Sequence, residues 1–583
     1  MIYILGISAF YHDSAACLLK DGEIIAASQE ERFTREKNDA SFPKKAIDFC
    51  LKEAGISIDD VSLITFYEKP FVKFERIIDS IKNTAPFGFL FFKKAIQSWV
   101  KVKLWIPSII RKELNYKGKM IFSEHHESHA AGAFFTSPYK ESAIVTVDGV
   151  GEKACITIGY GKDNHVKILK EQYYPHSFGL LYSAFTQYCG FKINSGEYKL
   201  MGLAPYGKPI YKKQILENLV TISKKGEVSL DMKYFSFDTG KTTINNHFCT
   251  VFGKPARKAE EKMSDFYCDI ASSIQSVTED FMATLLEYAK EITNTENVCL
   301  SGGVALNCKA NGELLKRNIF KNIWVQPAAG DSGGSMGSAF VGYYNYLKKE
   351  RKQIEDSLKK QIYLGSSFSD LEIEQVLKKY NIVYGKKDDL DLLEIVSEEL
   401  KNKKIVGCFQ GRAEFGPRAL GNRSILGSPL YADMKEHINM KIKMREGFRP
   451  FAPVVLEEKK ENWFEMEGSS KYMLFTFNGK NKGEIPSCIH EDNTARVQSL
   501  QQEDNEFLHN LISVFEKKTG CPILINTSFN IRGEPIVNSP FDALNCFFRT
   551  HMDVLVLQNY VVFKEDNKQP HKQFLKKIDF ELD

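Results

Sequence analysis

The chain has 583 residues, of which 43% are hydrophobic and 26% charged, and its net charge is +4. This composition is typical of a globular protein, and a chain of this length is expected to divide into two or three domains. The small net charge gives no electrostatic basis for binding nucleic acid or a membrane surface. The 12 cysteines are scattered without a Cys-x-x-Cys pair, which argues against a disulfide framework or a zinc ribbon.

The first residues and one apolar stretch bear on where the protein works. Residues 2–7 already have the pattern of a strand, and they lack the basic segment and cleavage site of a signal peptide. The apolar stretch at 86–110 is interrupted by lysines, so it is not expected to span a membrane. The sequence therefore predicts a cytoplasmic protein.

A strand pattern occurs twice in the first half of the chain. Expected strands at 2–7, 15–19 and 23–28 are followed much later by strands in the same order, at 143–147, 154–160 and 166–172. In the first copy Asp21-Gly22 separates two of them, which is a strong hairpin signal. Polar turns at 11–14 and 148–151 follow the first strand of each copy. Together with a glycine turn at 301–307, they predict a duplicated α/β core with a nucleotide-binding cleft, as in the actin-like ATPase class.

Two histidines four residues apart, His125 and His129, suggest a metal site. On a helix both would project from one face, and Asp331, in a glycine-rich turn, would supply a third ligand. A solvated or core-capping helix face is the alternative for such a pair. His126 would point about a hundred degrees away on a helix. The glutamate spacing of an HExxH metalloprotease is missing.

The second half of the chain has arginines in segments rich in Gly, Pro and Asn. Guanidinium groups held on turns suit a phosphate or a carboxylate, which they bind in bidentate fashion. Nucleic acid and structural salt bridges are the competing explanations. The arginines concerned are Arg418, Arg423, Arg445, Arg449, Arg496 and Arg532.

Ordered motifs run along nearly the whole chain. They are ILGISAFYHDSAACLL, DGEIIAASQEERFTREKNDASFP, HHESHAAGAF, SGEYKLMGLAPYG, LSGGVALNCKAN, PAAGDSGGSMGSA, GPRALGNRSIL, FRPFAP and INTSFNIRGEPIV. Together they resemble the NodU/CmcH-type carbamoyltransferase family, which carbamoylates nodulation factors, cephamycins and aminoglycosides such as tobramycin.

The resemblance implies a fold and a domain division. The expected fold class is α/β, with a duplicated actin-like (ribonuclease H-like) ATPase domain followed by an α+β YrdC-like domain. The first domain would cover 1–345, with lobes at about 1–140 and 141–345. A helical linker would cover 346–364, and the YrdC-like domain 365–583.

The implied activity is ATP-dependent O-carbamoyl transfer in two steps. The C-terminal domain would make carbamoyl adenylate from carbamoyl phosphate and ATP, the latter with Mg²⁺. The N-terminal domain would then transfer the carbamoyl group to a hydroxyl at a metal site. The family pattern implies Fe(II) there, whereas the residues alone indicate only a divalent ion with nitrogen and oxygen ligands.

Roles for individual residues follow from the motifs and the resemblance. His12 and Asp13 are the candidates for general base and its orienting partner, with turn formation as the alternative. Lys37 would reach the nucleotide phosphates, unless it is a solvated lysine. The residues expected to line the nucleoside are Asp148, Gly179, Gly202, Gly303 and Asn307. Those expected to hold carbamoyl phosphate and ATP are Arg418, Lys443, Arg449, Arg496, Ser528, Asn530 and Arg532.

Other functions would make different demands on the chain. A small-molecule kinase of the actin-like fold would leave the arginine-rich region unexplained. A tRNA-modification partner would need a basic RNA-binding surface. We therefore expect a small-molecule hydroxyl acceptor, such as a sugar, an antibiotic or a toxin-like natural product. We expect no nucleic-acid or membrane partner, and a homodimer is the default oligomeric state.

Overall fold

The computed structural model describes residues 1–84, 89–239, 242–351 and 362–575, which form two compact units. Of these residues, 1–30 and 39–351 belong to the first unit, and 31–38 and 362–575 to the second. The predicted linker at 346–364 falls largely on 352–361, outside the described residues, and residues 86–88 of the apolar stretch also lie outside them. Within the described ranges, no helix is long and apolar enough to cross a bilayer.

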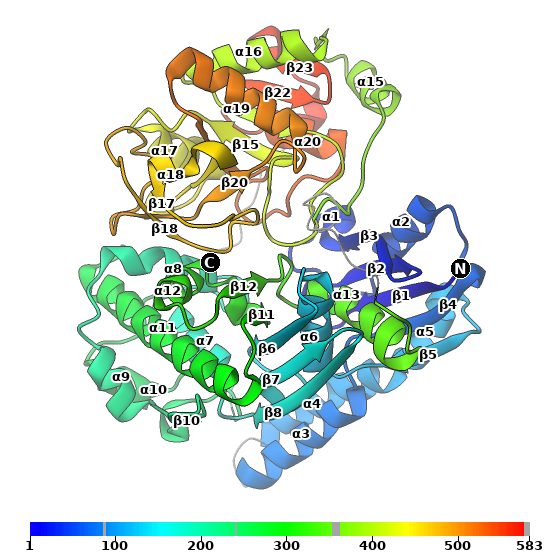
Figure 1. The fold of residues 1–583 in the computed structure, drawn as a ribbon, viewed down its shortest axis with the longest axis vertical. Helices are drawn as coiled ribbons and strands as arrows, with labels where there is room; N and C mark the ends of the chain where they lie inside the picture. Colours follow the sequence, from blue (N-terminus) through cyan, green and yellow to red (C-terminus); the bar gives the residue numbers. More distant parts are fainter. Residues whose placement is uncertain (85–88, 240–241, 352–361, 576–583) are drawn as a thin grey trace. The chain divides into compact units, whose positions relative to one another are not determined.

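The first unit contains two five-stranded sheets with the same strand order (Figure 1). The order is β3-β2-β1-β4-β5 in one sheet and β8-β7-β6-β11-β12 in the other. In each, the first three strands are antiparallel and the last two run parallel to the central one. This repetition confirms the predicted duplicated core of the actin-like ATPase fold. The strands are β1 (Tyr3–Ser8), β2 (Ala15–Lys20), β3 (Glu23–Gln29), β4 (Val61–Phe66), β5 (Lys119–Phe122), β6 (Glu141–Val147), β7 (Ala154–Lys162), β8 (His165–Tyr173), β11 (Asn297–Ser301) and β12 (Asn322–Val325).

The hairpin between β2 and β3 shows how local sequence sets this sheet. Asp21 and Gly22 have φ angles of 49° and 86°, the left-handed region that a two-residue type I′ turn requires at both positions. Glycine adopts it without steric cost, and Asp tolerates it better than most residues. The predicted turn is confirmed.

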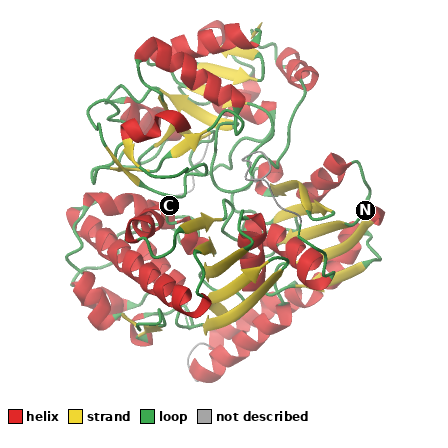
Figure 2. Cartoon of the chain, viewed as in Figure 1, coloured by secondary structure: helices red, strands yellow, loops and turns green. Residues whose placement is uncertain are grey.

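Helices cover the faces of the two sheets (Figure 2), and two of them meet. The helix α13 packs on β1 and β2, α6 packs on β6 and β11, and α6 and α13 pack against each other. The helices of this unit are α2 (Lys44–Ala54), α3 (Pro70–Thr84), α4 (Phe89–Lys101), α5 (Ile106–Leu114), α6 (His125–Thr136), α7 (Phe178–Tyr188), α8 (Glu197–Leu203), α9 (Lys212–Asn218), α10 (Asn246–Phe252), α11 (Asp265–Thr293), α12 (Cys308–Arg317) and α13 (Ser332–Phe340). A small hairpin is formed by β9 (Val220–Ile222) and β10 (Val228–Leu230).

The contact between α6 and α13 depends on glycine. A Cβ atom on Gly337 would lie 1.8 Å from the backbone oxygen of Ser128, and one on Gly132 would lie 3.4 Å from the Cα of Gly337. On the other side of α13, a Cβ on Gly6 of β1 would lie 1.9 Å from the oxygen of Ser335. Backbones can approach this closely only where no side chain intervenes. The glycines of α6, α13 and β1 therefore allow the two lobes to pack closely.

The second unit is built on an eight-stranded mixed sheet with the order β13-β23-β22-β14-β15-β21-β16-β20. The strands are β13 (Gly385–Lys386), β14 (Val406–Phe409), β15 (Arg423–Gly427), β16 (Ala452–Leu456), β20 (Gln498–Leu500), β21 (Ile523–Ser528), β22 (Val554–Leu557) and β23 (Tyr560–Phe563), and a smaller sheet has β17 (Phe464–Glu465), β18 (Phe477–Gly479) and β19 (Thr494–Ala495). The helices are α1 (Glu31–Thr34), α15 (Asp370–Lys379), α16 (Asp389–Lys401), α17 (Met434–His437), α18 (Lys460–Trp463), α19 (Glu506–Thr519) and α20 (Pro540–Phe548).

The register of this sheet brings several loops to one edge. Phe409 at the end of β14 lies opposite Arg423 at the start of β15, and Ser424 lies opposite Ser528 at the end of β21. The starts of β16 and β20 lie at the same edge, because β16 is antiparallel to β21 and parallel to β20. The loops that carry the predicted phosphate-binding residues therefore leave the sheet together.

Arg423 has a different role from the one expected of it. Its side chain is 0% exposed, its guanidinium carbon lies 3.6 Å from the ring centroid of Phe409, and it donates to the carbonyls of Gln410 at 2.5 Å and Ser366 at 3.0 Å. A guanidinium engaged in this way is not available to a ligand. The expectation that Arg423 binds phosphate was wrong, because its position as the first residue of β15 turns it into the core.

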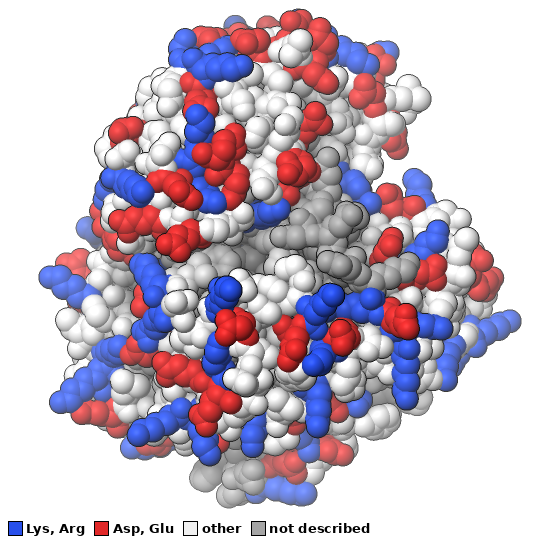
Figure 3. Space-filling model, in the orientation of Figure 1, with Lys and Arg blue, Asp and Glu red and all other residues white. Residues whose placement is uncertain are grey.

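Charges of both signs are mixed on the face drawn in Figure 3. Lysine and arginine lie between aspartate and glutamate on the surface of each unit. This mixture agrees with the small net charge of the chain.

We expect Gly337→Ala to destabilise the protein by roughly 1–3 kcal/mol, the usual cost of overpacking a tight contact. The added methyl group has to displace α6 or α13, because the atom that it meets belongs to the backbone. Urea unfolding measures the effect. Gly483→Ala is the control, because a Cβ there meets no atom within 4 Å; equal stability of both variants would contradict the proposed tight contact.

We expect Arg423→Ala to cost roughly 3 kcal/mol or more of unfolding free energy, since it leaves buried carbonyl groups without their donor. Urea unfolding followed by fluorescence would report the loss. The matched variant is Arg317→Ala on α12, where the exposed guanidinium pairs with Asp280 at 2.8 Å and where we expect a change below about 1 kcal/mol.

Candidate functional site

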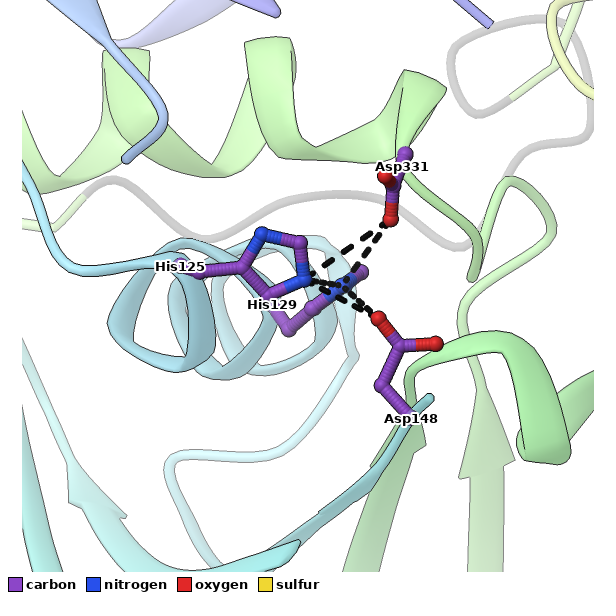
Figure 4. A group of neighbouring side chains, drawn as sticks. All are labelled: His125, His129, Asp148 and Asp331. Carbon is purple, nitrogen blue, oxygen red and sulfur yellow. Dashed lines mark hydrogen bonds and ion pairs between the residues drawn. The ribbon is translucent and has the colours of Figure 1, made fainter. Parts of the chain in front are cut away.

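Four side chains of the first unit converge at the α6–α13 contact (Figure 4). His125 and His129 project from the same face of α6, as their spacing predicts. Asp148 follows the last residue of β6, and Asp331 precedes the first residue of α13. Each lobe therefore contributes to the group through an element that packs at the junction.

The ligand atoms of these four residues all lie within 4.8 Å of one another. The Nε2 atoms of His125 and His129 are 3.0 Å apart, and Oδ2 of Asp148 lies 3.0 Å from the first and 3.6 Å from the second. Oδ1 of Asp331 lies 3.7 and 3.8 Å from the same nitrogens. Two imidazoles and two carboxylates of this kind suit a divalent ion with nitrogen and oxygen ligands.

Burial and charge act against each other in this group. Burial lowers the pKa of His125, but its contact with Asp148 and the charge of Asp331 outweigh that effect and raise the pKa to about 9. Burial raises the pKa of Asp148, and the two imidazoles outweigh it and hold this pKa well below its usual range. The two carboxylates therefore attract positive charge to the site, either as a proton on His125 or as a metal ion.

The structure brings Asp148 into the group with His125, His129 and Asp331, although the sequence suggested that it lines the nucleoside. Its other oxygen, Oδ1, accepts a hydrogen bond from the backbone nitrogen of Gly303 at 3.0 Å. A Cβ on Gly179 would lie 2.4 Å from the carbonyl oxygen of Asp148. Two of the predicted nucleoside glycines thus surround this aspartate. The sequence signal for its place in this group was a carboxylate directly after the central strand of the second sheet.

The other two predicted nucleoside residues have structural contacts. Asn307 caps α12 by accepting from the backbone of Ala310 at 3.0 Å, and its amide exchanges hydrogen bonds of 2.9 and 3.1 Å with Gln275. Gly202 is a buried residue of α8.

His12 lies beside the four-residue group. Its Nε2 is 3.6 Å from Oδ2 of Asp331, and its Nδ1 is 3.0 Å from Oδ2 of Asp13. Burial lowers the pKa of His12, but Asp331 and Asp13 outweigh it and raise the pKa to about 9. A cation bound at Asp331 would offset that carboxylate and favour the neutral imidazole. The predicted pairing of His12 with Asp13 is present in the structure.

Sequence reasoning missed Glu152, which supports the first turn of α6. Its carboxylate accepts from the backbone nitrogen of His125 at 3.0 and 3.1 Å, and from that of Lys69 at 2.6 Å. A negative charge at a helix N-terminus is stabilising. Further along α6, Oγ of Ser301 lies 3.3 Å from Nδ1 of His129, and Nδ1 of His126 lies 2.5 Å from Oγ1 of Thr146. These contacts fix the orientation of the helix and of its rings.

In the second unit, three predicted residues form one hydrogen-bonded group. The side chain of Lys443, in a residue only 2% exposed, donates to Oγ of Ser528 at 3.0 Å and to Oδ1 of Asn530 at 2.7 Å. It also donates to the carbonyl oxygen of Asn530 at 3.0 Å. Burial lowers the pKa of Lys443 well below its usual range, and the charges of Arg445, Lys37 and Arg449 add to this effect.

The predicted arginines of this unit lie in the loops at the same edge of the sheet. Arg418 lies between β14 and β15, Arg449 precedes β16, and Arg496 lies between β19 and β20. The backbone nitrogen of Arg532 donates to the carbonyl of Lys443 at 3.2 Å. Arg449 also pairs with Glu446 at 2.6 Å. We call these loops, together with Lys443, the basic edge; among their arginines, Arg445 and Arg449 lie near enough to lower the pKa of Lys443.

Two family models match most of the chain. The model described as "Carbamoyltransferase N-terminus" matches residues 3–340, and the one described as "Carbamoyltransferase C-terminus" matches residues 397–564. The first match lies within the first unit apart from residues 31–38, and the second match lies within the second unit.

Several relatives are similar over nearly the full length. The "Uncharacterized protein sll1178" of Synechocystis sp. is 47% identical over 100% of both chains. The nodulation protein NolNO of Sinorhizobium fredii is 34% identical and covers 96% of this chain and 80% of its own. The nodulation protein U of the same species is 26% identical, with coverages of 90% and 92%.

Solved structures are similar to part of the chain. Component A of the (R)-2-hydroxyglutaryl-CoA dehydratase of Acidaminococcus fermentans is 17% identical with a TM-score of 0.31, over 60% of this chain and 100% of its own. HypF of T. kodakarensis is 16% identical with a TM-score of 0.29, over 62% and 48%. The duplicated strand order, and not these low TM-scores, identifies the fold.

We expect Asp148→Asn to lower the affinity for a divalent ion such as Fe(II) at least tenfold, because the amide loses the charge that attracts the ion. Anaerobic titration calorimetry with the metal alone measures the affinity. Asp163→Asn, in the hairpin turn between β7 and β8, is the control. Unchanged metal binding combined with weaker ATP binding would favour the nucleoside role instead.

Proposed function

Because the chain belongs to the carbamoyltransferase family, we propose that it is an ATP-dependent O-carbamoyltransferase with one reaction step in each unit. The observation that carries this proposal is the presence of two different sites. One is the basic edge around Lys443, and the other is the buried group of two histidines and two aspartates.

The second unit would activate the carbamoyl group. Carbamoyl phosphate would first lose its phosphoryl group to water, which gives carbamate and inorganic phosphate. A carbamate oxygen would then attack the α-phosphorus of ATP, so that carbamoyl adenylate forms and pyrophosphate leaves. Both substrates are polyanions, and Mg²⁺ would accompany ATP. The residues proposed to hold them are Lys37, Arg418, Lys443, Arg449, Arg496, Ser528, Asn530 and Arg532.

Lys443 is the buried lysine of this site, and a bound polyanion would favour its ammonium form. A cation that has already lost its hydration interacts more strongly with phosphate oxygens than a solvated one. Ser528 and Asn530 hold its Nζ in place at 3.0 and 2.7 Å. The positive charges of Arg445 and Arg449, which disfavour the protonated lysine, would be offset by the bound polyanions.

The first unit would transfer the group. The oxygen of a hydroxyl acceptor attacks the carbamoyl carbon, the bond to the phosphate of AMP breaks, and the hydroxyl proton leaves. His12 is the proposed acceptor of that proton, and Asp13 would hold its ring through the 3.0 Å contact with Nδ1. Gly179, Gly202, Gly303 and Asn307 remain proposed contacts of the nucleoside.

The residues present fit a metal ion. His125, His129 and Asp331 are the proposed ligands, with Asp148 as a fourth, and three of these four are buried. Buried carboxylates beside imidazoles only 3.0 Å apart are stabilised by a shared cation. A bound Fe(II) or other divalent ion would act as a Lewis acid on an oxygen of the adenylate.

The acceptor class follows from the reaction type. An alcohol of a sugar, antibiotic or toxin-like natural product supplies the hydroxyl, so the partner is a small molecule. We also propose that the enzyme works in the cytoplasm, where ATP and carbamoyl phosphate are made, and that it forms a homodimer.

Pyrophosphate release from ATP tests the activation step. On protein loaded anaerobically with Fe(II), we expect pyrophosphate and AMP to form only when carbamoyl phosphate is present. Formation of ADP that does not depend on carbamoyl phosphate would contradict the proposal and indicate a kinase of the actin-like fold.

Two variants should separate the steps. We expect Lys443→Met to reduce carbamoyl-phosphate-dependent pyrophosphate release at least a hundredfold, as expected for the loss of a buried phosphate-binding charge. His129→Ala should leave pyrophosphate release within about threefold of wild type and lower metal content. Loss of pyrophosphate release in His129→Ala, with the folded fraction unchanged, would contradict the division between the units.

A further inference from the structure

A short segment near the N-terminus belongs to the second unit. Residues 31–38 are separated from the end of β3 by one residue, yet their contacts place them with residues 362–575. The segment contains α1 (Glu31–Thr34) and ends where the chain returns to the first unit at residue 39. Two of its arginines account for its attachment.

Arg35 holds the loop that follows β21. Its Nη1 donates to the carbonyl of Ile536 at 2.7 Å, and its Nη2 donates to the carbonyl of Pro535 at 2.8 Å. Its Nε lies 3.6 Å from Asp542 in α20. The same loop contains Arg532, so Arg35 grips it three residues beyond a proposed ligand of phosphate.

Arg32 holds the loop between β14 and β15. It is 4% exposed, and its Nη2 donates to the carbonyl of Gly416 at 2.8 Å. Gly416 has a φ of 116°, which favours glycine, and it lies two residues before Arg418. The two arginines of one short segment therefore hold two separate loops of the basic edge.

Lys37 extends the segment toward Lys443. It is exposed, and its positive charge is one of those that lower the pKa of Lys443, together with Arg445 and Arg449. The segment thus adds a cation to the basic edge as well as two arginine contacts.

We propose that Arg32 and Arg35 are positioning residues of the site around Lys443, and that these two arginines and Lys37 complete this site for a polyphosphate ligand. The inference rests on the proposed function for the identity of the ligand. The carbonyl contacts restrain the loops of Arg418 and Arg532 in the arrangement that a bound phosphate requires. Preorganisation of this kind strengthens binding, because the loops are already ordered before the ligand arrives.

A purely structural role makes a different prediction. If the arginines only anchored the segment, their removal would lower the folded fraction and the apparent kcat together and leave KM unchanged. A positioning role raises KM in the protein that remains folded, since the loops lose their preferred arrangement.

Arg35→Ala, Arg35→Lys and the control Glu36→Gln test the proposal in the full chain. Glu36 is an exposed residue of the same segment. We expect KM for carbamoyl phosphate in the pyrophosphate-release assay to rise about tenfold or more in Arg35→Ala, the effect of losing one or more charge-assisted hydrogen bonds. Added guanidinium ion should lower the KM of Arg35→Ala part of the way back to the wild-type value. The KM of Arg35→Lys should lie between those of the wild type and Arg35→Ala, because a lysine cannot donate to both carbonyls with the fork geometry of a guanidinium.

A binding measurement keeps the two proposals distinguishable. We expect calorimetry to show that inorganic pyrophosphate binds Arg35→Ala at least fivefold more weakly than it binds the wild type. Glu36→Gln should bind pyrophosphate as tightly as the wild type. Wild-type protein that releases no pyrophosphate from ATP would reject the proposed function, while this binding comparison would still decide the role of Arg35. Equal pyrophosphate affinity and equal KM in all variants would overturn the positioning role. If Arg35→Ala does not fold, Arg35→Lys and Arg32→Lys provide the same comparison.

Discussion

The close backbone contact between α6 and α13 is the constraint on which the first unit depends. A Cβ on Gly337 would lie 1.8 Å from the oxygen of Ser128, so the separation of these helices is set by the absence of a side chain. Because α6 carries His125 and His129 and α13 follows Asp331, the same contact determines the distances of 3.7 and 3.8 Å across the lobes. The same glycine contact therefore sets both the packing of the two helices and the positions of the histidines and aspartates of the candidate site.

The second unit reaches a comparable result through strand register instead of helix packing. Antiparallel pairing of β15 with β21, and of β16 with β21, brings a strand end and two strand starts to one edge. Loops at such an edge can each contribute one cation without a dedicated helix. Arg423 shows the limit of this logic. Arg423 is the first residue after the loop between β14 and β15. Its guanidinium points into the core and donates to carbonyls of that loop, such as the carbonyl of Gln410.

The repeated strand pattern, the Asp21-Gly22 turn and the histidine pair were readable from the sequence because each depends on residues close together in the chain. The Lys443, Ser528 and Asn530 group was reached only through family resemblance. Two features were not predicted. The position of Asp148 beside the two histidines depends on where the end of β6 meets α6. The attachment of residues 31–38 to the second unit depends on contacts between residues hundreds of positions apart. Local periodicity has no information on either, since both are set by tertiary packing.

The attachment of residues 31–38 to the second unit also constrains how the molecule can fold and evolve. Along the described residues the chain passes between the units three times, and Arg35 donates to the carbonyl of Ile536, 501 residues later. During synthesis the first unit is complete long before this partner leaves the ribosome, so the segment has to wait as a loop while its neighbours are already in β3 and α2. If the gene were divided between the two units, residues 31–38 would remain on the N-terminal protein, separated from the unit that they contact. A split pair of proteins would work only if the second recaptured this loop in trans.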